Sequence, residues 1–169
     1  MRRASSLQGG RGLWPFFLTA LGVVVADQLS KWWIVEHLEP KQSLFEAGIF
    51  KIALFPPNTG AAFGLFQDQP FALVIVAIFG IAFLLAYAFV IHRRFPLPGN
   101  LLSWSALGLI LGGITGNLVD RLRYLLHQVG GITDFISIGW WPPFNIADSA
   151  IVVGAILVAY SLLFLARKR

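Results

Sequence analysis

The chain of 169 residues contains no cysteine, and this absence excludes several kinds of chemistry. Without cysteine there is no disulfide bond, no thiolate ligand for a metal ion and no cysteine nucleophile. The absence is also compatible with loops that face an oxidising compartment.

Charged residues are scarce as well. They make up 12% of the sequence, whereas a soluble globular domain has about 25%. Hydrophobic residues make up 57%, and the mean hydropathy is +0.73. This composition argues against a soluble domain, and the length favours one membrane domain over residues 1–169.

The net charge of +5 does not indicate a nucleic-acid-binding protein, because the basic residues are not gathered in one patch. They stand instead beside the ends of long apolar runs, where positive charge sets the orientation of a membrane protein. We therefore expect no nucleic-acid partner. The three basic clusters are Arg2, Arg3 and Arg11, then Arg93 and Arg94, and finally Arg167, Lys168 and Arg169.

Four apolar runs are long enough to cross a bilayer, which takes about 20 residues of helix. Four spans place both termini on one side, and the basic clusters predict that this side is the cytoplasm. The first run is not typical of a cleaved signal peptide, because no small-residue cleavage site follows it. The sequence thus predicts an all-α integral membrane protein with four transmembrane helices, at about 12–31, 71–91, 97–119 and 144–166.

Two loops, 32–70 and 120–143, are then expected outside. Within the first, 44–55 is rich in β-prone residues but too short to span the membrane. It predicts a small β-rich extracytoplasmic subdomain between the first two helices, lying on the membrane surface. The second loop ends in Trp140 and Trp141, which suit the headgroup layer, and two prolines that prepare the fourth helix.

Four of the eight acidic residues stand at or near the ends of these apolar runs. If the runs cross a membrane, all four meet at the same face, together with Asn58, Asn117 and Asn145. A carboxylate at the centre of a membrane helix costs about 2.5–3.5 kcal/mol on insertion scales, so it usually has a function. The sequence predicts a membrane-embedded acid–base site formed by Asp27, Asp120, Asp134 and Asp148.

Simpler interpretations exist for three of these aspartates. Asp120 beside Arg121 favours an ion pair that closes a helix end over a catalytic role. Asp27 is four residues from Lys31, the spacing of an ion pair within one helix. Asp134 could be a helix N-cap or a solvated loop residue.

No such simpler interpretation applies to Asp148. It lies inside a predicted span, with no cation within one turn on its own helix. Near the start of that helix, the macrodipole lowers the cost of its charge. Taken singly, only this aspartate favours a function.

Other residues predict packing rather than chemistry. Gly108, Gly112, Gly113 and Gly116 have the small-xxx-small spacing of close helix packing. The turn from Gly60 to Gly64 allows close approach of the backbone to a ligand or a helix. The three histidines share no metal-binding spacing, and no serine has a base placed beside it, so we expect neither a metal site nor a serine–histidine pair.

Five ordered motifs together resemble the bacterial lipoprotein signal peptidases, the signal peptidase II family. The resemblance covers nearly the whole chain, from the first predicted helix to the fourth. The motifs are Asp27-Gln28-Leu29-Ser30-Lys31, Asn58-Thr59-Gly60-Ala61-Ala62-Phe63, the run from Gly112 to Arg121, Thr133-Asp134-Phe135, and Phe144-Asn145-Ile146-Ala147-Asp148-Ser149.

The resemblance implies an intramembrane aspartic endopeptidase of the bacterial inner membrane, with both termini cytoplasmic and its site toward the extracytoplasmic face. It implies removal of signal peptides from prolipoproteins, on the amino side of a diacylglyceryl-modified cysteine. It also implies membrane lipid as a partner, globomycin as an inhibitor, and no cofactor or metal. Carried over by motif, the catalytic pair is Asp134 and Asp148, with Asp27, Asn58, Gly60, Asn117, Asp120, Arg121 and Asn145 binding substrate or supporting the site.

Two rival interpretations belong to other functional classes. A proton-coupled transporter would also place aspartates in the membrane, but it should carry polar groups deep in several helices. The second predicted span carries only Tyr87 as a polar group between 73 and 89. A non-enzymatic assembly protein would simply pair its aspartates with Lys31, Arg121 and Arg123. The segment 122–132, which is longer than is usual in the family, leaves the shape of the second outer loop undefined.

Overall fold

A computed structural model describes residues 13–61, 65–95, 97 and 101–165. The first and last basic clusters lie outside the described residues, as do Ala62 and Gly64 of the turn after Asn58.

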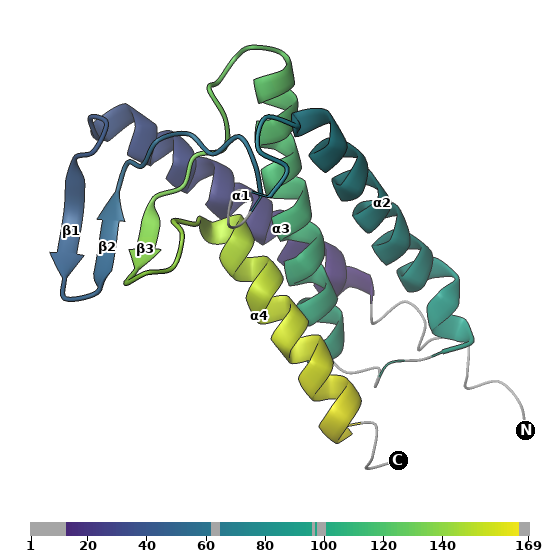
Figure 1. The fold of residues 1–169 in the computed structure, drawn as a ribbon. Helices are drawn as coiled ribbons and strands as arrows, with labels where there is room; N and C mark the ends of the chain where they lie inside the picture. The colour runs from purple at the N-terminus through teal and green to yellow at the C-terminus, as the bar shows by residue number, and fades with distance from the viewer. Residues whose placement is uncertain (1–12, 62–64, 96, 98–100, 166–169) are drawn as a thin grey trace, which may run out of the picture.

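Four long helices dominate the fold (Figure 1). They are α1 (Leu13–His37), α2 (Pro70–Phe89), α3 (Leu101–Leu125) and α4 (Ile146–Tyr160), with short helical turns η2 (Ile91–Arg93) and η3 (Ser161–Leu165) after α2 and α4. All four are long and apolar enough to cross a membrane. The predicted class of a helical membrane protein with four spans is therefore confirmed.

Two helices continue beyond the apolar runs that predicted them. Helix α1 extends past residue 31 to His37, and α3 extends past Asp120 to Leu125. Neither extension contains proline or glycine, so nothing in the backbone ends the helix where the apolar run ends. The length of the apolar run determines how much of the helix lies within lipid, whereas the helix itself ends only where the backbone meets a helix-breaking residue.

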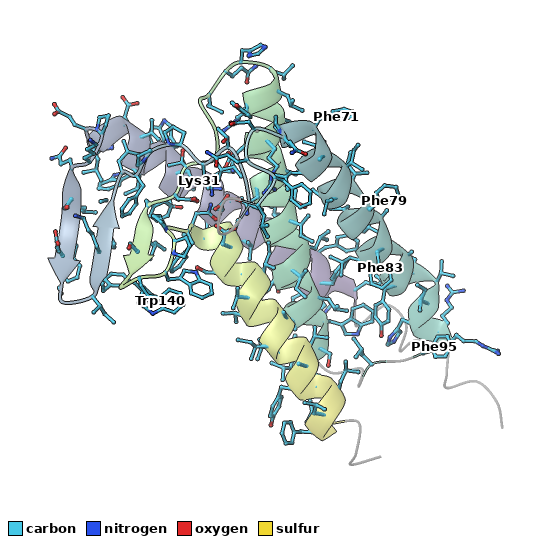
Figure 2. All side chains as sticks on the ribbon, in the orientation of Figure 1. Lys31, Phe71, Phe79, Phe83, Phe95 and Trp140 are labelled. Atoms are coloured by element: carbon cyan, nitrogen blue, oxygen red, sulfur yellow. The ribbon has the colours of Figure 1, made fainter. Side chains whose placement is uncertain are left out.

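Large apolar side chains cover the outer face of the bundle. On α2, Phe71, Phe79 and Phe83 are 67%, 72% and 63% exposed, and Figure 2 shows them pointing away from the other helices. A soluble monomer rarely leaves so continuous an apolar surface in water, whereas lipid chains cover it in a bilayer. The chain is a multi-pass membrane protein.

Helix α3 is central and packs against each of the other three helices. Its glycines make this possible, as the small-xxx-small spacing predicted. A Cβ atom at Gly112 would lie 2.6 Å from the carbonyl oxygen of Ala20 on α1, and one at Gly113 would overlap the carbonyl oxygen of Ala147 on α4. Any side chain at these positions would push the helices apart.

A three-stranded antiparallel sheet lies beside the end of the bundle where α1 ends and α4 begins (Figure 1). Its strands are β1 (Ser43–Ala47), β2 (Phe50–Ala53) and β3 (Ile136–Ile138), in that order. The first two coincide with the predicted segment 44–55, except that β1 begins one residue earlier, and they are joined through Gly48, whose φ of 59° is left-handed. The predicted small β-rich subdomain between the first two helices is confirmed by β1 and β2, and the second outer loop adds β3 as a third strand that the sequence did not predict. A strand of three residues is too short to leave a pattern in the sequence.

The sheet aligns the two outer loops where it meets the bundle. Beyond β2, the backbone N–H of Phe55 donates to the carbonyl of Asp134 at 3.3 Å. Asn58 and Ile132 then exchange two backbone hydrogen bonds of 2.9 Å each. This pairing holds Asn58 beside Asp134, although the two are far apart in the sequence.

Candidate active site

Polar side chains from three helices and both outer loops meet where α4 begins. Asp27, Asp120, Asp134 and their asparagine neighbours Asn117 and Asn145 are buried. Figure 2 shows Lys31 among oxygen atoms at this end of the bundle. All four predicted aspartates are therefore brought together at one end, as the placement at the ends of the apolar runs predicted.

Asp148 is fixed by the local sequence at the start of α4. Asn145 is the N-cap, and its side-chain oxygen accepts from the backbone N–H of Asp148 at 3.0 Å. In return, Oδ2 of Asp148 accepts from the backbone N–H of Asn145 at 3.2 Å. This reciprocal capping box holds the carboxylate in the first turn, where the helix dipole favours negative charge.

Asp134 lies in the loop before β3 and is only 3% exposed. Its Oδ1 accepts from Nδ2 of Asn145 at 2.8 Å, and its Oδ2 accepts from Nδ2 of Asn58 at 3.0 Å. Burial raises the pKa of Asp134 to about 7, and the nearby charge of Asp148 acts in the same direction against the amide hydrogen bonds. The alternative of a solvated loop aspartate is wrong.

Asn145 joins the two carboxylates, because its side chain donates to Asp134 and its backbone N–H donates to Asp148. Both carboxylates line a cavity of about 860 Å³. Its lining is partly polar and partly apolar, and the residues that α2 contributes are all apolar and form an apolar wall. The polar lining includes Asn58, Gly60, Asn117, Arg121, Asp134 and Asp148, and the apolar lining includes Leu73, Val76, Ala77 and Val152.

Lys31 forms a buried ion cluster next to this cavity. Its Nζ lies 2.8 Å from Oδ2 of Asp27 and 2.6 Å from Oδ2 of Asp120. The predicted pair within α1 is therefore confirmed. The predicted pair of Asp120 with Arg121 is wrong, because Asp120 pairs with Lys31 across the helix interface.

Asp27 also reaches α4. Its Oδ1 accepts from the backbone N–H of Ala147 at 2.9 Å, which satisfies one of the free amides in the first turn of that helix. Gln28 adds further links, since its Nε2 donates to Asp27 and to Asp120. These contacts join α1, α3 and α4 directly behind the dyad.

Arg121 and Gly60 both line the cavity. The guanidinium Nε of Arg121 is buried without a hydrogen-bond partner among the described residues. The backbone N–H of Gly60 donates to Oδ1 of Asn58 at 2.9 Å, and a Cβ atom there would lie 2.9 Å from the carbonyl of Leu65. The predicted close backbone approach thus occurs within the turn itself.

Two residues of the network were not among the predicted site residues. The sequence predicts no role in the site for Gln28, and it predicts Lys31 only as an ion-pair partner of aspartates. Their spacing within one helix indicates an ion pair but cannot reveal contacts to α3. In the described part of the chain, no three histidine, aspartate or glutamate side chains are grouped to hold a metal ion.

Comparisons with known proteins agree with this arrangement. The family model of signal peptidase (SPase) II matches residues 19–164. The lipoprotein signal peptidase of Dehalococcoides mccartyi is 42% identical over 146 residues, which cover 86% of this chain and 86% of that protein. That of Moorella thermoacetica is 40% identical over 149 residues, 88% of this chain and 93% of that protein.

Two solved structures of bacterial membrane enzymes have the same fold. One has a TM-score of 0.75 at 29% identity and covers 88% of this chain and 87% of that enzyme. The other has a TM-score of 0.71 at 30% identity, with coverage of 88% and 92%. The four membrane helices, the acidic site at their end and the match over nearly the whole chain lead to one conclusion: this protein belongs to the signal peptidase II family of lipoprotein signal peptidases.

Proposed function

We propose that this protein is an aspartic endopeptidase that removes signal peptides from prolipoproteins, cutting on the amino side of a diacylglyceryl-modified cysteine. One observation carries the proposal: the carboxylates of Asp134 and Asp148 line the same cavity and are both hydrogen-bonded to Asn145. Two carboxylates that share a site cannot both ionise easily, so they retain one proton between them.

The proposed reaction uses that proton and one water molecule. The ionised Asp148 takes a proton from the water molecule. At the same time, the water oxygen attacks the scissile carbonyl carbon. Asp134, protonated, donates to the carbonyl oxygen, which gives a tetrahedral gem-diol. When the C–N bond breaks, the leaving nitrogen takes the proton held by Asp148, and a gem-diol hydroxyl returns a proton to Asp134. No acyl-enzyme, metal or cofactor takes part.

The raised pKa of Asp134 supports its role as the acid. Because this pKa is about 7, a large fraction of Asp134 keeps its proton at neutral pH. Asp148 stands in the first turn of α4, where the helix dipole and the capping box favour its charge.

The neighbouring polar groups have supporting roles in this proposal. Amide N–H groups of Asn58, Asn117 and Asn145 hold the carboxylates in place. Asp27 and Asp120 hold the helices together through Lys31. Arg121 and Gly60 line the cavity, where they would contact the peptide backbone of the substrate.

The rival functions fit the contacts less well. The assembly-protein interpretation correctly pairs Asp27 and Asp120 with Lys31, but within the described residues no cation forms an ion pair with Asp134 or Asp148. The transporter interpretation needs a polar path, yet the cavity wall on α2 is formed by Leu73, Val76 and Ala77.

The same apolar wall supports the choice of substrate. A signal peptide and two acyl chains all partition into lipid, and each buried CH₂ contributes about 0.8 kcal/mol. The acyl chains would hold the cysteine at the depth of the dyad. By family resemblance, we also propose the cyclic peptide globomycin as an inhibitor of this site.

We further propose that the protein is a single domain in the bacterial inner membrane, with 32–70 and 120–143 outside. The support is the distribution of basic residues at both ends of the chain and at Arg93 and Arg94, between α2 and α3.

The topology predicts the locations of two reporters. A reporter fused after Arg169 should be cytoplasmic, and one inserted near Gln67 and Asp68 should be external, as measured by labelling of intact cells. An external reporter after Arg169 would contradict the four-span orientation.

The dyad predicts that Asp134→Asn and Asp148→Asn each reduce cleavage of a diacylglyceryl-modified prolipoprotein by at least about a hundredfold, because an amide cannot exchange the proton. Both variants should still accumulate in the membrane. Asp68→Asn, the same change at an exposed loop residue, is the matched control and should keep full activity. Appreciable turnover by either dyad variant would remove that residue from the mechanism.

The pKa of Asp134 predicts the alkaline side of the pH profile. As the pH rises above about 7, Asp134 loses the proton that it donates, and kcat/KM should fall about tenfold for each further pH unit. Cleavage rates measured from pH 6 to pH 9 in one detergent test this. A rate that stays constant up to pH 9 would exclude Asp134 as the acid.

The apolar wall predicts that the lipid on the substrate is required. A prolipoprotein with an unmodified cysteine should be cut at least about a hundredfold more slowly than its diacylglyceryl-modified form, since it loses the anchoring that orients the scissile bond. The two substrates should be compared in the same detergent. Equal rates would mean that the protein does not recognise the lipid.

A further inference from the structure

Lys31 is a buried cation, and one of its three hydrogen bonds leads to the dyad through Asn117. It is 4% exposed, and its Nζ contacts Asp27 at 2.8 Å, Asp120 at 2.6 Å and Oδ1 of Asn117 at 3.2 Å. An ammonium group has three protons and no acceptor. These three contacts therefore use its full donor capacity.

The third contact fixes the orientation of Asn117. Because Lys31 can only donate, the amide oxygen of Asn117 must face it, and the amide nitrogen must face the other way. That nitrogen donates to Oδ1 of Asp148 at 2.7 Å. Asn145 also donates to the same amide oxygen at 3.3 Å, so the amide cannot reverse without losing two donors.

The two carboxylates of the dyad differ in their access to this cation. Asp148 is one amide group away from Lys31, through Asn117. Asp134 is two amide groups away, through Asn117 and Asn145. In addition, Asp148 stands at a helix N-terminus and Asp134 stands in a loop.

We propose that Lys31 is a positioning residue for the reaction: through Asn117 it holds Asp148 as the ionised member of the dyad, which leaves the shared proton on Asp134. This inference rests on the proposed aspartic mechanism. It adds the group that determines which of the two carboxylates is ionised and which holds the proton.

The other charged groups around the dyad do not supply this asymmetry. Arg121 on α3 acts electrostatically on both dyad carboxylates, as Lys31 also does, so the asymmetry rests on the shorter hydrogen-bonded path from Lys31 to Asp148 through Asn117. Asp27 and Asp120, on α1 and α3, are negative and would favour a proton on the dyad. Helix α2, which forms the apolar wall of the cavity, carries no charged residue.

The burial of Lys31 also needs an explanation beyond stability. Burying charges costs free energy that the pairing recovers only in part, and apolar replacements of buried ion clusters are often neutral or stabilising. A cluster of one cation and two anions additionally keeps a net negative charge. Its contact with Asn117 gives it a function that an apolar core could not supply.

The test is a charge-matched double variant, Lys31→Met with Asp120→Asn. It removes one positive and one negative charge, so the net charge of the cluster stays the same while the cation facing Asn117 is lost. Asp120→Asn alone is the matched control, because it leaves Lys31 in contact with Asp27 and Asn117. Both are assayed as purified full-length protein in detergent, with a diacylglyceryl-modified prolipoprotein over a range of pH.

We expect the acid limb of the kcat profile to move to higher pH by about one unit in the double variant, because the dyad takes up its second proton more easily. At pH values below the acid limb this should appear as a roughly tenfold loss of kcat with little change in KM. Asp120→Asn should not move the acid limb upward. If the double variant fails to accumulate, Lys31→Gln with Asp120→Asn, which keeps a polar group but no charge, should give the same shift.

A purely structural role for Lys31 would lower the amount of protein or its unfolding temperature and leave the pH profile in place, and that result would overturn the inference. It would do so separately from the proposed function. Suppose that Asp134→Asn and Asp148→Asn are inactive but the double variant has an unshifted acid limb. The proposed dyad is then supported, and the proposed role of Lys31 is wrong. If either aspartate variant is active, the proposed dyad is wrong.

Discussion

The ammonium of Lys31, held between Asp27 and Asp120, joins the helices on which the rest of the site depends. Asp27 accepts from the first turn of α4, and Asp120 belongs to the central helix α3. Glycines on α3 let α1 and α4 approach closely enough for these short side chains to meet. Close helix packing is therefore a condition of the polar network and not an independent feature of the fold.

Much of this arrangement could be predicted from the sequence because membrane helices follow simple rules of length and polarity. The four spans and the convergence of four aspartates at one face depend on those rules alone. The roles of Asp134 and Asp148 needed ordered motifs, since a loop aspartate such as Asp134 has no pattern of its own. Asp134 is buried because residues 53–58 pair with residues 132–135, and no local pattern in the sequence indicates this pairing.

The missed features have a common physical cause, which is that the sequence does not specify how helices rotate against each other. Asp120 and Arg121 are adjacent in the chain, but successive residues on a helix point about 100° apart, so neighbours do not face the same partner. One turns toward Lys31 on α1, and the other lines the cavity. Strand β3 was missed for a related reason, because its three residues become a strand only by pairing with β2.

The four-residue spacing of Asp27 and Lys31 has a consequence for how the protein enters the membrane. While the chain is being synthesised, α1 reaches the bilayer before α3 and α4 exist. With both charges one turn apart on the same helix, the segment can insert as a neutral pair. Asp120 and the first turn of α4 reach this pair only later, the latter 120 residues along the chain. The first helix thus carries its own counter-ion for a site that is completed by the last one.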